Sequence, residues 1–229
     1  MAARIATNAA EFLERAQAQS TPVVILTGEQ EAQLGFEAII GDPMFSDTDR
    51  ISIVDPGGQS TEMVTASRVD GQWVVDFRRS YPVGTLGLKS THFPEERVDG
   101  LTLLRATGAL DDQIGVCYRP GQCGEVVVLG AAGTNLVSVR DVLTRWQPDI
   151  VHGARLEYEE ISKAVGWMMP LSDAERREIP GLELGRENTI HLGAFILERF
   201  LFALRAEYCR VSVRGWRYAL LANLDAFPL

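Results

Sequence analysis

Residues 55–62 carry the side-chain types that bind a phosphate group and its metal ion. The apolar run 51–54 leads into Asp55, Gly57, Gly58, Ser60, Thr61 and Glu62. Glycines let backbone N–H groups approach phosphate oxygens, and hydroxyls donate hydrogen bonds to them. Carboxylates are hard oxygen ligands that suit Mg²⁺. A strand–turn–strand with a polar loop explains the segment alone equally well, because short glycine motifs are weakly specific.

A second acidic segment precedes it, at the start of an expected helix. The apolar run 23–26 predicts a strand, and Thr27 with Gln30 forms a capping-box pattern that opens a helix. Glu29 and Glu31 fall in the first helical turn, where the helix dipole favours acids in any protein. Position alone therefore assigns neither glutamate a catalytic role.

Both segments belong to a longer series of motifs in a recognisable order. The series comprises residues 4–8, 26–34, 54–62, 82–86, 130–134, 151–153, 180–182, 186–193 and 214–221. Residues 26–34 are similar to S/T-G-x-E-E-A-x-L, 54–62 to D-I-G-G-G-S-T-E, and 130–134 to G-x-G-G-T. Their shared order over nearly the whole chain resembles the exopolyphosphatase and guanosine pentaphosphate phosphohydrolase (Ppx/GppA) family.

The resemblance implies a reaction and a role for each matched residue. The reaction would be hydrolysis of phosphoanhydride bonds, releasing orthophosphate from polyphosphate or converting pppGpp to ppGpp. Glu31 matches the family's glutamate before alanine, so it is preferred over Glu29 as the general base. Asp55 and Glu62 would hold Mg²⁺, and Glu62 would also be catalytic. The implied phosphate-binding residues are Arg4, Gly57, Gly58, Ser60, Thr61, Gly130, Gly133 and Thr134.

The resemblance also implies an actin-like, sugar-kinase-like fold of two domains facing a cleft. Family members carry a D-x-G-T-N-S motif before the region that matches here, so we expect the chain to correspond to the later two-thirds of the family. Residues 1–40 would be the end of the first domain. Residues 41–229 would form the second, with a helical insertion at about 152–208. A lone strand cannot satisfy its backbone edges, so 1–40 would lack support within this chain.

The element pattern independently favours a ribonuclease-H-like α/β domain, because antiparallel strands precede alternating strands and helices. Strands are expected at 23–26, 51–54, 62–67, 73–77, 125–129 and 210–213, with an Asp70-Gly71 hairpin turn. Helices are expected at 9–17, 29–40, 85–92, 98–110, 135–146, 158–168, 173–178, 189–206 and 216–221. Both glycine motifs then follow strand ends, where α/β sheets bind ligands.

Composition limits the class of protein. The chain has 229 residues, 46% hydrophobic and 23% charged, with a net charge of −9. These values predict a soluble cytoplasmic protein without a signal peptide or a membrane span. The negative charge argues against nucleic-acid binding, and it requires cations and local arginines to offset it at a site for polyanions. The oligomeric state stays open, with a homodimer compatible with a cleft family of this size.

Several departures from the family motifs bear on activity. Gln59 stands where the family has its third glycine, Pro56 replaces isoleucine, and Ala132 replaces a glycine of the second motif. Gln59 adopts a positive φ less readily than glycine and adds a side chain near the expected phosphate. An alternative reading is therefore a non-catalytic module that binds polyphosphate or (p)ppGpp. A sugar or acetate kinase of the same superfamily is a third reading, for which no substrate motif is found.

Overall fold

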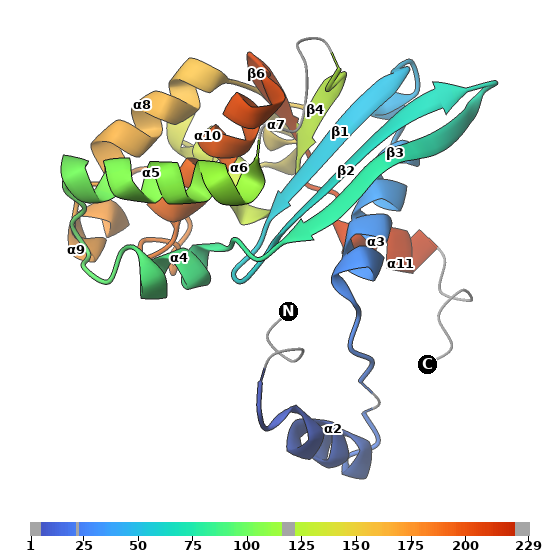
Figure 1. Cartoon of the computed structure of the whole chain (residues 1–229), viewed down its shortest axis with the longest axis horizontal. Coiled ribbons are helices and arrows are strands. Elements are labelled where there is room, and N and C mark those ends of the chain that lie inside the picture. Colours follow the sequence, from blue (N-terminus) through green and yellow to red (C-terminus); the bar gives the residue numbers. More distant parts are fainter. Residues whose placement is uncertain (1–5, 22, 116–121, 223–229) are drawn as a thin grey trace.

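The computed structural model describes residues 6–21, 23–115 and 122–222 (Figure 1). The strands are β1 (Arg50–Pro56), β2 (Thr61–Val69), β3 (Gln72–Tyr81), β4 (Glu125–Val128), β5 (Arg155–Glu157) and β6 (Tyr208–Val211). The helices are α2 (Ala9–Ala18), α3 (Gly28–Ile40), the 3-10 turn η1 (Pro43–Phe45), α4 (Thr85–Thr91), α5 (Gly100–Ile114), α6 (Gly130–Arg140), α7 (Pro148–Val151), α8 (Tyr158–Met168), α9 (Asp173–Arg177), α10 (Ile190–Leu204) and α11 (Trp216–Ala222).

The strands form one mixed sheet in the order β3-β2-β1-β4-β6-β5. The first three strands are antiparallel neighbours, and β4 and β6 run parallel to β1. The carboxyl ends of β1, β4 and β6 therefore lie at one edge of the sheet. Three antiparallel strands followed by helix-connected parallel strands confirm the ribonuclease-H-like α/β prediction. The hairpin turn is also confirmed, because Asp70 and Gly71 have φ of 51° and 77°, as a two-residue hairpin turn requires.

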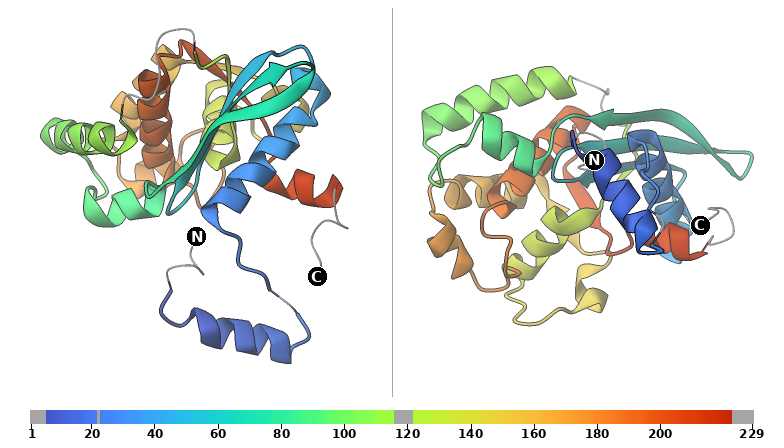
Figure 2. Two further views of the ribbon diagram at one scale, coloured as in Figure 1. Left: turned by 45° about the vertical axis from the view of Figure 1, so that its right-hand side comes forward. Right: turned by 90° about the horizontal axis from the view of Figure 1, so that it is seen from below.

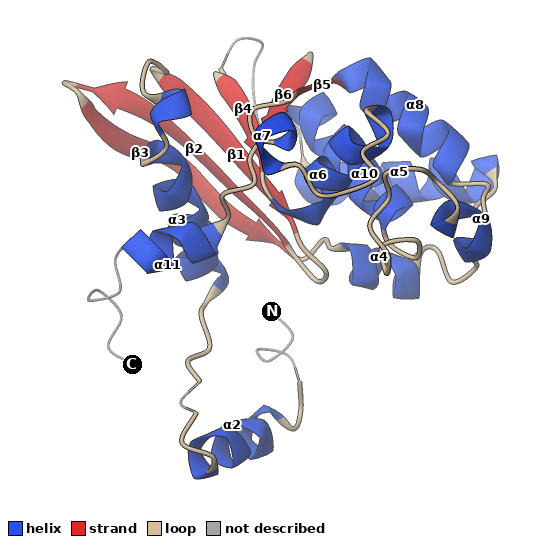
Figure 3. Cartoon of the chain, turned by 180° about the vertical axis from the view of Figure 1, so that it is seen from behind, coloured by secondary structure: helices blue, strands red, loops and turns tan. Residues whose placement is uncertain are grey.

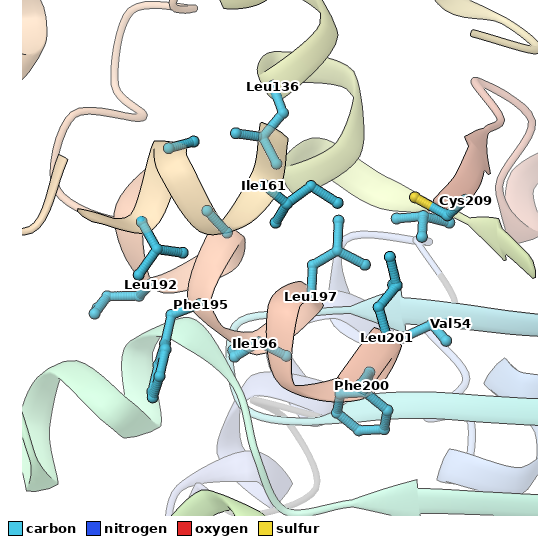
Figure 4. Packing of buried hydrophobic residues seen from close by; sticks show 14 of the residues in the cluster. Val54, Leu136, Ile161, Leu192, Phe195, Ile196, Leu197, Phe200, Leu201 and Cys209 are labelled. Atoms are coloured by element: carbon cyan, nitrogen blue, oxygen red, sulfur yellow. The ribbon is translucent and has the colours of Figure 1, made fainter. Parts of the chain in front are cut away.

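Helices cover both faces of this sheet (Figure 2). On one face, α3 and η1 pack on the sheet through a core that includes Phe36, Ile51 and Val64. On the other, α10 is buried along almost its whole length and packs with α5, α6 and α8. Figure 4 shows Phe195, Ile196 and Phe200 of α10 within this larger core. Because successive side chains of β1 point to opposite faces, this strand contributes residues to both cores.

The buried arginine of α10 is accommodated by a partner on α5. Arg199 is 7% exposed, and its guanidinium makes two hydrogen bonds to Asp111, with Nε–Oδ1 at 2.7 Å and Nη2–Oδ2 at 2.8 Å. A bidentate pair of this kind satisfies a buried arginine. The helix expected at 189–206 is confirmed at 190–204, and it is buried despite its two charged residues. Among the described helices, none is long and apolar enough to cross a membrane.

Arg176 joins several segments of the helical region through its buried side chain. Its side chain is fully buried, and its guanidinium donates to four backbone carbonyls and one carboxylate. These acceptors are Glu96 O, Met168 O, Leu171 O, Glu187 O and Asp173 Oδ1. All five donors of the guanidinium are thus used. The contacts tie together the ends of α8 and α9 and the segments at 96 and 187.

The N-terminal part differs from the sequence prediction. The expected strand at 23–26 is wrong: residues 23–27 form an irregular extended segment, because no neighbouring strand offers the hydrogen bonds that a strand needs. Helix α2 has no buried residue, and Figures 1 and 3 show it apart from the rest of the chain. Helix α3, by contrast, packs on the sheet. The lack of support expected for 1–40 thus holds for α2 and fails for α3; the domain boundary at 41 stays a prediction.

Other elements also depart from the predictions, among them α6 and β5. Helix α6 begins at Gly130 and ends at Arg140, whereas the sequence analysis placed this helix at 135–146. The glycine motif therefore forms the first helical turn instead of a loop before it. Strand β5 is too short to produce a periodic pattern, and it was missed; it extends the sheet by pairing with β6.

Candidate functional site

The site begins with acids at the carboxyl end of β1. Asp55 lies opposite Glu62 in the antiparallel β1–β2 pair, and Glu62 lies opposite Ser80 of β3. Directly opposed residues project on the same face of a sheet. This is the face that α3 covers, since Ile53 and Val64, two residues along each strand, pack in the α3 core. Both strands thus present a carboxylate beside the first turn of α3.

Asp55 has a strongly altered acidity. Its pKa is raised from 3.8 to about 7, first because burial removes water from the carboxylate, then because Glu62 and Glu31 add negative charge nearby. Glu31 contributes to this shift from the first turn of α3, the helix that packs on this face of the sheet. The structure thus brings together the three acids that the sequence analysis singled out, although they come from three different elements.

The two glutamates of the α3 first turn have different surroundings. Thr27 and Gln30 form the predicted capping box, with reciprocal hydrogen bonds of 3.1 and 2.8 Å, so the start of α3 is fixed. The carboxylate of Glu29 faces the guanidinium of Arg78 at 3.6 Å and is 76% exposed. Glu31 is half-buried and acts on Asp55. This geometry favours Glu31 over Glu29 as the residue that faces the site.

The turn after β1 is held by the start of α4. Gly57 N donates to Ser60 O at 2.8 Å, while Thr85 N and Leu86 N donate to the carbonyls of Gly57 and Gly58 at 3.0 and 2.7 Å. A Cβ on Gly84 would overlap the backbone of this turn. Glycine at 84 is therefore what lets α4 approach so closely.

Gln59 causes less strain than the sequence analysis expected. The residues of the structure with positive φ include none of Gly57, Gly58 and Gln59. The turn thus has no left-handed position that would demand a third glycine. The side-chain oxygen of Gln59 lies near Gly87 of α4. The substitution by itself does not argue against an intact turn.

The two hydroxyls of the turn have partners within the protein. Ser60 Oγ donates to Glu62 Oε1 at 2.7 Å, and Ser80 Oγ donates to the same oxygen at 2.7 Å. Thr61 is fully buried, and its Oγ1 donates to Val83 O at 2.7 Å. Neither Ser60 nor Thr61 is among the residues that line the two cavities described below. These hydroxyls fix Glu62 and the β2–β3 end, and their assignment to phosphate stays a prediction.

The second glycine motif meets the first at Asp55. Gly130 has a φ of +78°, and a Cβ there would lie 2.9 Å from Asp55 Oδ1. Both facts require glycine. Gly133 is buried, and a Cβ would press on Val128 and Val211 at 3.0 and 3.2 Å, so this glycine lets α6 pack on the sheet. Thr134 Oγ1 lies 3.3 Å from Ala131 O, within its own helix.

Two cavities meet at this point. The larger, of about 700 Å³, extends along α6 toward Trp146 and Trp216. The smaller, of about 430 Å³, extends along the 57–58 turn and α4. Asp55, Gly130, Ala131 and Arg186 line both. The two cavities therefore share one junction, which contains Asp55 and the start of α6.

Arg186 is a site residue that the sequence analysis did not select. It is the cation that lines both cavities, whereas Arg145 and Arg217 line the larger one. Its Nε lies 3.1 Å from Glu183 Oε2. Its only sequence signal was its place in the motif segment 186–193, since a single arginine in a turn carries no pattern. Arg4, selected for phosphate binding, lies outside the described residues.

The acids fit a magnesium ion only as part of a larger set of ligands. No group of three or more His, Cys, Asp or Glu side chains that could hold a metal occurs among the described residues. Mg²⁺ usually keeps several waters and needs only one or two carboxylates beside substrate phosphates. Asp55 and Glu62, on one face of the sheet, match that smaller demand. A buried carboxylate whose pKa is raised also gains from a nearby cation.

Known proteins share this architecture and motif order. A sequence profile of the Ppx/GppA phosphatase family matches residues 1–224. A crystal structure of an Aquifex aeolicus Ppx/GppA family member has 26% sequence identity and a TM-score of 0.84, covering 98% of this chain and 72% of that one. A second study of the A. aeolicus PPX-GPPA enzyme gives 27% identity and a TM-score of 0.83, covering 97% and 73%.

Two less similar structures share the fold. An exopolyphosphatase-like protein has 21% identity and a TM-score of 0.87, with 98% of this chain and 75% of that one covered. An exopolyphosphatase from Cytophaga hutchinsonii has 14% identity and a TM-score of 0.82, with 99% and 73% covered. The fold is accordingly actin-like, of the ribonuclease-H type. With its profile match spanning almost all of its residues, the chain belongs to the Ppx/GppA phosphatase family, a family of phosphohydrolases.

Proposed function

We propose that this protein hydrolyses a terminal phosphoanhydride bond, releasing orthophosphate from inorganic polyphosphate or from pppGpp. The observation that supports this most is the junction of the two cavities at Asp55. There a glycine turn, the first turn of α6 and an arginine surround one point, and Glu31 lies near it. Phosphoryl transfer needs charge stabilisation around the phosphoryl group and a positioned water. The surroundings of the junction offer both.

Each residue has a role that its position allows. Gly57, Gly58 and Gly130 let backbone groups approach phosphate oxygens without a Cβ. Arg186, which lines both cavities, neutralises charge on the phosphate chain. Glu31, at the fixed start of α3, accepts a proton from the attacking water. Glu62, whose Oε1 is held by Ser60 and Ser80, stays in a defined orientation beside Asp55.

Mg²⁺ is the cation we propose for this site, held by Asp55, Glu62, water and substrate phosphates. When bound, it would neutralise charge on the phosphates. The chain's own contribution is to keep the two carboxylates on one face of the sheet. Deprotonation of Asp55 is required for this, so binding of the cation should strengthen as the pH rises through about 7.

The test is a phosphate-release assay with polyphosphate and with pppGpp in the presence of Mg²⁺. Glu31→Gln is expected to lower kcat by about 10²- to 10⁴-fold, the usual contribution of a general base. Glu29→Gln is the matched control: it sits in the same helical turn but faces Arg78 at the surface. It should keep nearly full activity.

Two results would overturn the proposal in different ways. Equal activity of the Glu31 and Glu29 variants would remove Glu31 from the reaction. Tight binding of both substrates by the parent protein with no phosphate released would identify a binding member of the family instead of an enzyme.

A further inference from the structure

Arg186 reaches the junction of the two cavities from a segment that has no regular structure of its own. Residues 178–189 connect α9 to α10 through successive turns. The side chain of Arg186 is 44% exposed, and its described ion pair is with Glu183, three residues earlier. A long side chain on such a segment points in a defined direction only if other residues hold the segment.

Asn135 of α6 is the residue that meets this segment. It is 4% exposed, and its Oδ1 accepts a hydrogen bond from the backbone N–H of Glu183 at 2.9 Å. Its Nδ2 donates to Ala131 O at 3.0 Å and lies 3.5 Å from Glu183 Oε2. That same carboxylate oxygen accepts from Arg186 Nε at 3.1 Å. One buried amide thus contacts both the main chain and the side chain of the residue that holds Arg186.

Two further contacts keep the segment in place on either side. Gly181 has a φ of +87°, and a Cβ there would overlap Ser138 O of α6, so the segment lies directly against this helix. Glu187 accepts from Gly185 N at 2.7 Å and from Arg177 Nη2 at 2.6 Å. Between these two contacts, Asn135 holds the segment at Glu183. Asn135 also belongs to α6, whose first turn, at Gly130, forms part of the proposed phosphate site.

We propose that Asn135 is a positioning residue that directs Arg186 toward the phosphate site through Glu183. Both ends of its amide bond to protein groups, so, although Asn135 lines the larger cavity, the effect we propose for it runs through Glu183. The inference rests on the proposed function, in which Arg186 binds substrate phosphate. The second glycine motif of the sequence analysis ends at Thr134, one residue before it.

The test is a double-mutant cycle on the full chain, with inorganic tripolyphosphate binding measured by titration calorimetry at constant salt. Arg186→Ala is expected to raise the Kd about tenfold, the effect of one charge-assisted hydrogen bond. Asn135→Ala should raise it by a similar factor. The double variant should bind no more weakly than Arg186→Ala alone, because both changes remove the same interaction. Independent effects, about 100-fold together, would overturn the inference.

Other outcomes separate this inference from the proposed function. An unchanged Kd for Asn135→Ala, with a raised Kd for Arg186→Ala, rejects the positioning role alone. An unchanged Kd for Arg186→Ala, or a parent protein that does not bind tripolyphosphate, rejects the phosphate role of Arg186 and the inference with it.

Control variants separate positioning from general loss of stability. Ser52→Ala removes buried hydrogen bonds to Thr65 and Cys123 elsewhere in the sheet, so it should lower the melting temperature and leave the Kd unchanged. Asn135→Asp serves if Asn135→Ala does not fold. It keeps the acceptor for Glu183 N but places a carboxylate beside Glu183 Oε2. It should raise the Kd, and an unchanged Kd would contradict the proposal.

Discussion

At the scale of single residues, Asp55 has the most informative environment. It belongs to a regular strand, yet its partly buried carboxylate lines two cavities and is influenced by two other acids. An uncompensated buried carboxylate lowers the stability of a fold once it is ionised. Its presence at the junction of two cavities therefore indicates a site for a cation or a proton.

The pH dependence of stability follows from this carboxyl group. Its pKa in the folded protein, about 7, exceeds its ordinary value of 3.8, so the folded state binds more protons between these values. Stability is thus highest at low pH, as far as this group is concerned, and declines as pH rises toward 7. Asp55→Asn should therefore raise the free energy of unfolding more at pH 8 than at pH 5.

Urea denaturation of both proteins at the two pH values measures this difference. Because pH 5 lies about two units below the pKa of about 7, the difference is on the order of 3 kcal/mol, and bound Mg²⁺ should reduce it by stabilising the parent protein alone. A gain that is equal at pH 5 and pH 8 would show that Asp55 does not ionise near neutrality.

Sequence alone could identify Asp55, Glu31 and Glu62 as candidates, but it could not give the hydrogen-bond partners of the residues around them. Ser60 and Thr61 have the chemistry of phosphate donors, yet their hydroxyls bond to Glu62 and Val83. That choice depends on which groups lie opposite on β2 and β3. Arg186 and Asn135 carry no local pattern, because their relevance comes from a contact between α6 and a turn 48 residues further along the chain.

At the scale of elements, the start of α6 is the most constrained. Gly130 has a left-handed backbone, and its missing side chain leaves room for Asp55 Oδ1. Gly130→Ala should cost about 1–2 kcal/mol for the backbone alone, plus displacement of the carboxylate. Gly108→Ala is the matched control, since a Cβ there in the middle of α5 meets nothing within 4 Å. It should stabilise the protein by about 0.5–1 kcal/mol.

Thermal denaturation of both glycine variants tests this contrast, and the activity of Gly130→Ala should fall with its stability. A Gly130→Ala protein as stable as the parent would mean that the turn can open away from Asp55. A loss of stability for Gly108→Ala would contradict the open environment seen in α5.

The elements with strong periodicity or clear end signals were predictable, and the others were not. Helix α8 was predicted at its observed bounds, and the capping pattern at Thr27 correctly marked the start of α3. The segment at 23–26 has an equally good strand pattern, but strand formation requires a neighbour that sequence does not reveal. The short strand β5 exists only because β6 offers an edge.

At the scale of the whole molecule, the N-terminal region divides at α3. Phe36 on α3 is 4% exposed and packs against Trp73 and the sheet, whereas Phe12 on α2 is 52% exposed. Phe36→Ala should lower the free energy of unfolding by about 3–5 kcal/mol. Phe12→Ala should change it by no more than about 0.5 kcal/mol.

Chemical denaturation followed by circular dichroism compares the two phenylalanine variants. Similar losses for both would mean that α2 contributes to the main core, contrary to its lack of buried residues. The fold class was predictable from the sequence, whereas the packing of α3 on the sheet formed by residues that follow it was not.

The buried guanidinium of Arg176 has a consequence for the way the molecule responds to acidity. Four of its five acceptors are peptide carbonyls, which do not titrate, and arginine itself keeps its proton in proteins. The segments that Arg176 holds should keep their positions from mildly acidic to alkaline solution, while Asp55 changes its charge near neutrality. A change in pH thus alters the charge of the pocket without altering the segment that holds Arg186.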